Sequence, residues 1–412
     1  MVERYRLIRN VGFVLYTSLL WTSAVLALVA AYRQRQAWVM GDWLIHYASG
    51  FVRRGLLGQI LIMLSRATGL KPGVFVVLTI LSVYAGFLFW AMRALQQQPR
   101  IMPFLLALMA PFLFLYPLWQ WQGAYRKEIL LFALYAWLVQ SVARAPDTVF
   151  PRTAFALTLL PLILLSHEGL MAWAPFLLVP LFVHRPKPKQ WPARWRYSLF
   201  VLVGINLVAW LVALAARGTP EQSQAIRQAL KAMHYDIPAP GAIVWLAKPA
   251  APLITKQCTR WIHEGWRWLG LLALVSIAYL PLGPRLARFW RVRGIRALWL
   301  LSAGMMLGLM CVALDWGRFV HIYGMMLFLS LLSVRDEHDI PWQVQPSTLN
   351  HVYIIFSFTY GLTWPWHVIA GFTRWRFPLE TIYRLWMNHS DLAKELWHWL
   401  PVVWSVLAKL LP

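Results

Sequence analysis

Residues 11–31 read VGFVLYTSLLWTSAVLALVAA, an apolar run without a charged side chain. A helix of about 20 apolar residues is long enough to cross the hydrocarbon core of a bilayer. The basic segment of residues 1–10 leads into this run with no evident small-residue cleavage site, so we interpret the run as a retained first span. Similar runs recur along the chain and predict an all-α, polytopic integral membrane protein.

The composition of the whole chain supports this fold class. Of 412 residues, 60% are hydrophobic and 13% are charged, whereas soluble domains carry about 25% charged residues. Mean hydropathy is +0.55. These values exclude an ordinary soluble enzyme, a disordered protein and a coiled coil. The two cysteines, Cys258 and Cys311, give neither a disulfide framework nor a metal-ligand spacing.

The lengths and spacing of the apolar runs predict about 11–13 transmembrane helices, which form a single transmembrane domain of residues 1–412. The predicted spans are 11–31, 73–93, 101–119, 129–143, 154–166, 169–183, 198–216, 268–282, 297–315, 318–333, 351–371 and 397–411. An interfacial outer loop of about 32–72 follows the first span, and a large outer loop of about 217–268 follows the seventh. Within the large loop, residues 222–234 predict a short amphipathic helix with Ile226, Leu230 and Met233 on one face.

The stretch Leu56–Leu64 decides the predicted topology. Its apolar run is too short to span and contains Gln59, so we interpret it as an interfacial helix. With this helix lying flat, the basic loops 184–196 and 285–296 face the cytoplasm together with the N-terminus. If it spans, both loops face outward. The positive-inside rule favours the flat interpretation.

The charge balance of the chain points to an anionic partner. Lys and Arg number 39 against 15 Asp and Glu, for a net charge of +24. About half of the cations lie in inner loops, where orientation explains them. The others lie on the predicted outer side. In a membrane protein the expected partners are membrane lipids or an anionic substrate, and no nucleic acid.

Four short motifs combine acids with bases or histidines near span ends, where ionisable side chains usually mark function. The predicted topology places all four on the outer side, although orientation was inferred from other loops. They are Asp42 followed by Arg53 and Arg54; Arg126, Lys127 and Glu128; His167 and Glu168; and Asp315, Arg318 and His321.

Each motif also has a local structural interpretation. Asp42 begins an interfacial helix as its cap, and Arg53-Arg54 reaches lipid headgroups. Residues 126–128 form a salt bridge at a helix end, and Asp315 pairs with Arg318 three residues later. His167 lies in a structural turn with its ring satisfied internally. The glycines that flank Leu56 and Leu57 instead suggest close approach of the backbone to a phosphate.

Taken together, the motifs suit transfer chemistry on a lipid-linked phosphate. Several Arg or Lys side chains bind a pyrophosphate, best in bidentate geometry. A carboxylate in an apolar cleft is a natural general base, because burial raises its pKa. A histidine beside a glutamate can move protons or help to hold a divalent cation. The site therefore favours a polyprenyl-phosphate- or pyrophosphate-linked sugar donor at the outer leaflet.

The layout resembles that of polytopic membrane glycosyltransferases of the C-type fold, in which an outer loop with an essential acid and interfacial helices follows the first span. Here Asp42 follows the first span, residues 43–69 supply the interfacial stretch, and 217–268 follow the seventh span. The family often has paired acids in that loop, whereas Asp42 precedes Trp43, which leaves metal dependence open. In size, span count and outer arginines the chain also resembles O-antigen or capsule polymerases.

We therefore expect a glycosyltransferase or polysaccharide polymerase of the bacterial inner membrane, active at the periplasmic face with a cytoplasmic N-terminus. Asp42, Glu168 and His167 are the predicted catalytic residues. The predicted substrate-binding residues are Arg53, Arg54, Arg126, Lys127, Glu128, Asp315, Arg318 and His321. The partners are a polyprenyl-linked glycan donor and a glycan or lipid acceptor, and a divalent cation is an open cofactor. The alternatives are a transporter or flippase for an anionic lipid-linked glycan and a non-catalytic assembly protein.

Overall fold

The computed structural model describes the chain except for residue 1 and residues 186, 249–250, 335–347, 368–370 and 373–412. Apart from one two-stranded hairpin, the regular elements of the described residues are helices. The first half contains α1 (Val2–Arg33), α2 (Val39–Trp43), α3 (Gly55–Thr68), α4 (Pro72–Gln96), η1 (Met102–Phe104), α5 (Leu105–Leu108), α6 (Tyr116–Trp119), α7 (Trp121–Ala124), α8 (Glu128–Arg144), η2 (Pro146–Thr148), α9 (Val149–Ser166), η3 (Glu168–Leu178), α10 (Val179–His184) and η4 (Pro188–Gln190).

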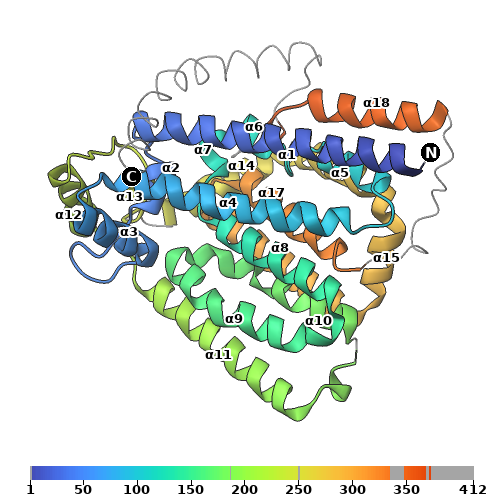
Figure 1. The fold of residues 1–412 in the computed structure, drawn as a ribbon. Helices are drawn as coiled ribbons and strands as arrows, with labels where there is room; N and C mark the ends of the chain where they lie inside the picture. Colours follow the sequence, from blue (N-terminus) through green and yellow to red (C-terminus); the bar gives the residue numbers. More distant parts are fainter. Residues whose placement is uncertain (1, 186, 249–250, 335–347, 368–370, 373–412) are drawn as a thin grey trace, which may run out of the picture.

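The second half contains α11 (Ala193–Ala215), α12 (Pro220–Ala232), α13 (Ala242–Trp245), α14 (Ala251–Tyr279), η5 (Leu280–Leu282), α15 (Gly283–Arg291), α16 (Arg293–Val312), α17 (Trp316–Leu331), α18 (Thr348–Leu362), β1 (Trp366–His367) and β2 (Gly371–Phe372). The two strands pair antiparallel, with Trp366 opposite Phe372. The elements labelled η are 3₁₀ helices. The arrangement is shown in Figure 1.

The described residues contain six helices that are long and apolar enough to cross a membrane, so the protein is a multi-pass membrane protein. These are Asn10–Arg33, Pro72–Gln96, Pro146–Ser166, Ala193–Ala215, Gly270–Arg291 and Arg293–Val312. Helices α8 and α17, with 17 and 16 residues, match the predicted elements at 129–143 and 318–333 but are shorter than the other six. The predicted span 397–411 lies outside the described residues.

Three predicted spans are wrong as continuous helices. Residues 101–119 form η1, α5 and α6, separated by turns, because Pro103, Pro111 and Pro117 lack the amide donor that a helix interior needs. Residues 169–183 begin as the 3₁₀ helix η3, which contains Pro175, and become α-helical only from Val179. Residues 351–371 leave α18 at Leu362 and enter the hairpin.

The predicted short helix after the first span is confirmed as α3, 14 residues long. One side of α3 is buried, at Gly55, Gly58 and Leu61, whereas Ile60 and Met63 are 46% and 59% exposed. An exposed apolar side on a short helix is the surface that an interfacial helix presents to lipid.

The large loop predicted at 217–268 is shorter in the structure, because α14 already begins at Ala251. Its first part contains the predicted amphipathic helix as α12, with Ile226 and Leu230 buried. Thr219 caps α12 by accepting a hydrogen bond from the Gln222 amide. The loop packs on the start of the chain: Ala242 donates its amide hydrogen bond to the Ala37 carbonyl.

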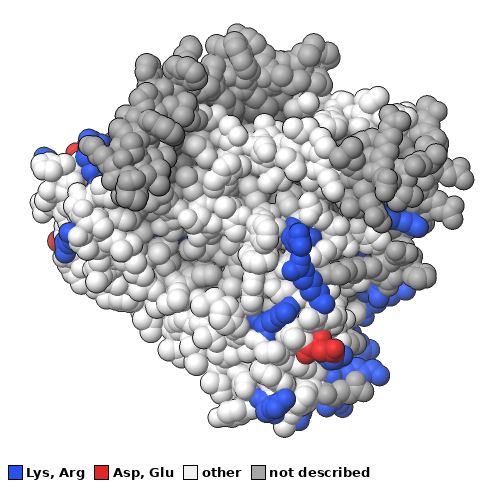
Figure 2. Space-filling model, viewed as in Figure 1, with Lys and Arg blue, Asp and Glu red and all other residues white. Residues whose placement is uncertain are grey.

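The two ends of the helical bundle differ. In Figure 1, α2, α3, α12 and α13 gather at the left, whereas the N-terminus and α15 lie at the right. Lysine and arginine side chains gather at the lower right of the surface in Figure 2, near α10 and the start of α11. The four motifs of the sequence analysis lie at the end of the bundle opposite the N-terminus, at the end of α9 and the starts of α3, α8 and α17.

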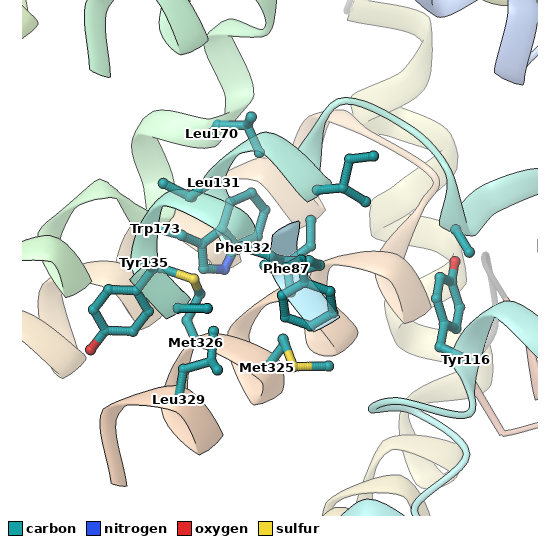
Figure 3. Packing of buried hydrophobic residues seen from close by; sticks show 14 of the residues in the cluster. Phe87, Tyr116, Leu131, Phe132, Tyr135, Leu170, Trp173, Met325, Met326 and Leu329 are labelled. Atoms are coloured by element: carbon teal, nitrogen blue, oxygen red, sulfur yellow. The ribbon is translucent and has the colours of Figure 1, made fainter. Parts of the chain in front are cut away.

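The core beneath this end of the bundle is aromatic and sulfur-rich. Phe87 of α4, Phe132 of α8 and Trp173 of η3 are at most 3% exposed, and Met325 and Met326 of α17 lie in the same cluster, below these rings in the view of Figure 3. Packing at this density holds side chains and helices in fixed positions. The starts of α8, η3 and α17 therefore keep fixed relative positions, and these starts carry three of the four motifs.

The substitution Gly58→Ala is expected to destabilise the protein. A Cβ atom at Gly58 would lie 1.8 Å from the Ile45 carbonyl oxygen, a backbone atom that cannot move without displacing the turn after α2. Overpacking of this kind costs about 1–3 kcal/mol, so thermal unfolding in detergent shifts down by several degrees. The matched control is Gly86→Ala in α4, where nothing lies within 4 Å of the new atom. An unchanged midpoint for Gly58→Ala contradicts the packing described here.

Candidate functional site

Residues from all four motifs form one buried charged cluster. Eight of its candidates are at most 5% exposed: Asp42, Arg126, Lys127, Glu128, His167, Glu168, Arg318 and His321. The side chains of Arg53, Arg54 and Asp315 are 22%, 21% and 27% exposed, so they form the edge of the cluster nearest the surface. The described residues thus bring together charges that lie far apart in sequence.

Arg54 and Glu168 form the tightest ion pair of the cluster. The Arg54 Nε atom donates to both carboxylate oxygens at 3.1 and 3.0 Å, and Nη2 donates to Oε1 at 2.8 Å. Arg53 approaches the same carboxylate at 3.5 Å. Arg54 immediately precedes α3 and adopts a left-handed conformation with φ of +66°, which a side-chain-bearing residue rarely adopts. The strained residue is thus fixed by its bidentate partner.

Arg126 joins two acids from different motifs. Its Nη1 atom donates to Asp315 Oδ2 at 3.2 Å, and Nη2 lies 3.8 Å from Asp42 Oδ1. The guanidinium also lies 5.9 Å from the ring centre of Trp38. Trp38 directly precedes α2 and was not among the predicted site residues.

Arg318 and Glu128 extend the cluster toward the bundle interior. Arg318 Nη2 contacts Asp315 Oδ2 at 3.0 Å, and its Nε lies 3.5 Å from Glu128 Oε1. Glu128 is the first residue of α8, and Asp315 is the residue immediately before α17. The starts of these two helices, which pack against each other, therefore bring the pair together.

Lys127 is completely buried, and its ammonium donates one hydrogen bond of 2.9 Å, to the Arg54 carbonyl oxygen. Within the described part of the chain no carboxylate lies within ion-pair distance of this ammonium. An ammonium group carries three donors, so Lys127 has donors that the described residues do not use.

Other polar atoms of the cluster also have no hydrogen-bond partner among the described residues. These are both carboxylate oxygens of Asp42, both those of Glu128 and both ring nitrogens of His167. Buried polar groups are normally hydrogen-bonded, and unsatisfied ones cost about 1–3 kcal/mol each. Several such groups lie together here with ionised side chains, which makes the cluster the candidate functional site of the described residues.

Burial and neighbouring charges shift the pKa values of four side chains in the cluster. Burial alone would raise the pKa of Asp42, but Lys127 and Arg126 together hold it well below its usual value. Burial would likewise raise the pKa of Glu168, and the Arg54 pair lowers it to about 2. Burial lowers the pKa of Lys127 to about 8, although Asp42 opposes the shift. Burial also lowers the pKa of His167 well below its ordinary value, so its ring is neutral at pH 7.

Most of the local interpretations of the motifs do not describe these contacts. Asp42 lies within α2 and makes no cap hydrogen bond. Arg54 binds Glu168 rather than reaching headgroups. Arg126, Lys127 and Glu128 do not pair with one another. Arg126 and Glu128 contact the motif of Asp315 and Arg318, and Lys127 contacts Arg54. The Asp315–Arg318 pair is present as expected, but Arg126 shares it.

The contacts of His321 and of the glycines near the start of α3 lie within the protein. His321 is buried but lies against Tyr116, with ring centres 4.1 Å apart, and its Nδ1 contacts the Phe112 carbonyl oxygen at 2.7 Å. It therefore supports the cluster rather than contacting its charges. Gly55 faces the Tyr47 ring and Gly58 faces the Ile45 carbonyl, so close packing within the protein accounts for both glycines.

The site also uses groups that the sequence did not indicate. Tyr116, from the predicted span 101–119, is fully buried and its hydroxyl has no hydrogen-bond partner in the described part of the chain. The large loop reaches the cluster through backbone atoms: the Ala216 carbonyl accepts from the Arg53 amide at 2.8 Å, and the Leu246 carbonyl accepts from Arg53 Nη2 at 3.3 Å. No sequence pattern marks a backbone carbonyl as a ligand.

Among the described residues, no group of three or more His, Cys, Asp and Glu side chains has the arrangement of a metal site. Cys311 is a free, exposed cysteine.

Stability is expected to rise with pH because of Lys127. Its pKa of about 8 in the folded protein lies below the 10.5 of an exposed lysine, so between these values the unfolded chain binds more protons. Raising the pH from 7.5 to 9.5 then stabilises the fold by about 2 kcal/mol. Denaturant unfolding in detergent at both pH values measures this difference. Lys127→Met should abolish the rise, and the exposed control Lys231→Met should retain it; a full rise in Lys127→Met contradicts the assignment.

Searches of family models, curated proteins and solved structures find no match for this chain. The cluster itself combines four carboxylates, four arginines, one lysine and a neutral histidine at one end of a membrane-spanning bundle. Their common feature is the set of buried polar atoms that the described residues leave without partners.

Proposed function

We propose that the protein is a membrane glycosyltransferase or polysaccharide polymerase that transfers a sugar from a lipid-linked phosphate or pyrophosphate donor. The observation that carries the proposal is Asp42. It is fully buried, ionised, without a hydrogen bond to the described residues, and next to two cations that face it. A structural aspartate in such a position would be expected to have hydrogen-bond partners.

The cations favour a phosphate-bearing substrate. Lys127 has unused donors beside Arg126, and Arg53 lies at the exposed edge. Phosphate oxygens accept charge-assisted hydrogen bonds from such side chains. Since a charged lysine without a paired acid is expensive to bury, an anionic ligand would recover part of the free energy that its burial costs.

Asp42 is the proposed general base. It takes the proton of an acceptor hydroxyl, whose oxygen forms the new bond to the anomeric carbon of the sugar as the bond from that carbon to the phosphate oxygen breaks. The departing phosphate keeps the electron pair, and Lys127 and Arg126 stabilise its charge. A bound phosphate also offsets the field of these two cations at Asp42, which raises the pKa of Asp42 toward the range of an effective base.

Glu168 has a positioning role in this proposal, not the catalytic one expected from the sequence. Both of its oxygens bind Arg54, and its pKa of about 2 keeps it ionised. His167 lies beside Glu168 with a neutral ring and two free nitrogens, so it is suited to accept or donate a hydrogen bond to the sugar. Glu128 and Asp315 hold Arg318 and Arg126 in place.

The position of the exposed edge of the cluster supports a lipid-linked donor. This edge, at Arg53 and Arg54, adjoins α3, whose outer side presents Ile60 and Met63. A carrier lipid lying along α3 would place its phosphate at this edge. The positive-inside rule supports the proposed orientation, in which this end of the bundle faces the periplasm of a bacterial inner membrane and the N-terminus lies in the cytoplasm. A transporter is the alternative, and transport of lipid-linked glycan across liposomes without glycosidic-bond formation would favour it.

Asp42→Asn is expected to abolish sugar transfer. Loss of a general base lowers rates by about 10²–10⁴-fold, whereas the amide keeps the shape of the side chain. In cells whose own copy is replaced by the variant, unextended lipid-linked sugar accumulates and can be measured by mass spectrometry of the lipid fraction. The control is Asp236→Asn, in the large loop and exposed. Normal product from Asp42→Asn would show that Asp42 is not the base.

Inorganic pyrophosphate is expected to stabilise the purified protein. A ligand that binds only the folded state stabilises it by about 2.7 kcal/mol at a concentration one hundred times its dissociation constant. The thermal shift should disappear in Arg126→Gln and persist in Arg66→Gln, which removes an exposed charge of α3. A shift of equal size in both variants means that the anion binds elsewhere.

A further inference from the structure

A concave surface lies at the end of the bundle opposite the charged cluster. A groove of about 500 Å³ runs between α15, α16 and α17, lined by Leu286, Ala287 and Trp290 of α15, Trp299 of α16, and Tyr323 and Leu327 of α17. Arg291, the last residue of α15, also lines it and is its one charged lining residue. Arg318 of the charged cluster and Leu327 are nine residues apart on α17, which is about 14 Å along a helix.

The groove faces the lipid-exposed side of the bundle. Trp290 is 44% exposed, and Leu300 and Leu301 of the adjoining α16 are 55% and 54% exposed. Helix α16 is one of the six long apolar helices. Exposed apolar residues around a groove on such a helix indicate a surface in contact with acyl chains.

Two polar groups in this groove have unused hydrogen-bonding capacity. Arg291 is exposed and forms no ion pair with any described residue. Trp299 is 3% exposed, and its buried indole N–H has no hydrogen-bond partner among the described residues. A buried indole donor usually finds an acceptor. An apolar groove with a guanidinium at its edge and an unused N–H donor suits a ligand with an apolar chain, an ester carbonyl and an anionic head.

We propose that this groove binds an anionic diacyl phospholipid, with the phosphate on Arg291, an ester carbonyl on the Trp299 N–H and one acyl chain against Leu286 and Leu327. Arg293, which follows two residues later and is exposed, strengthens the preference for a negative headgroup. The site is separate from the charged cluster, and its existence does not depend on the proposed sugar transfer.

Lipid binding can be measured directly on the full chain. The delipidated protein is titrated in detergent with phosphatidylglycerol or phosphatidylcholine, and bound lipids are counted by native mass spectrometry. The wild type should bind phosphatidylglycerol more tightly than phosphatidylcholine. Arg291→Gln should weaken the anionic lipid by about fivefold, from roughly 1 kcal/mol per basic residue, and leave the neutral lipid unchanged.

Further variants distinguish lipid binding in the groove from the general attraction of anionic lipid to basic side chains. Ala287→Trp fills the groove from an exposed helix position and should lower the binding of both lipids without loss of folding. Trp299→Phe keeps the ring and removes the donor, which should weaken both. The control Arg194→Gln removes an exposed cation at the start of α11 and should bind like the wild type. Equal binding of the two lipids by the wild type, or unchanged binding in Arg291→Gln and Ala287→Trp, overturns the proposal.

Discussion

The ion pair between Arg54 and Glu168 is the contact on which the charged cluster depends. It joins residues 114 positions apart, and it holds the residue before α3 in a left-handed conformation. That conformation directs the Arg54 carbonyl oxygen to the Lys127 ammonium. One carboxylate thereby positions a guanidinium, a strained backbone and a buried lysine. Without Glu168 the partly exposed Arg54 guanidinium would lose its bidentate partner, and the left-handed backbone before α3 would lose the contact that fixes it.

Interrupted helices make this arrangement possible. An uninterrupted α9 would carry Glu168 further along its own axis, but the chain leaves α9 at Ser166, passes through the extended His167 and continues as the 3₁₀ helix η3. Likewise the prolines of residues 101–119 break a span into short turns that place Tyr116 against His321. Irregular backbone at membrane depth is tolerated where it lies inside the protein or lines a polar cavity. The features that made the sequence hard to divide into spans are thus the ones that build the cluster.

The sequence predicted the gathering of the motifs but not their pairing. Topology alone placed the four motifs at one end of the bundle, because helix ends alternate between the two sides of a membrane. The partners of Arg126 and Lys127 were not predictable, since they lie 189 and 73 residues away. Nearest-neighbour rules suggested local salt bridges there, and tertiary packing replaced them. Three predicted spans are not continuous helices, because hydropathy measures composition, whereas prolines decide where a helix ends.

The buried charges of the cluster lower the free energy of unfolding of the protein. Lys127 and Asp42 are both fully buried, yet the described residues leave hydrogen bonds of both unmade. An apolar pair at these positions would fold at least as well, because burying charge costs more than packing gains. A protein retains such groups when a ligand completes them, and then the same free energy that destabilises the free protein strengthens binding. In the proposed reaction the completing ligands are an anionic phosphate near Lys127 and an acceptor hydroxyl at Asp42, and each supplies the hydrogen-bonding partner that the described residues leave out.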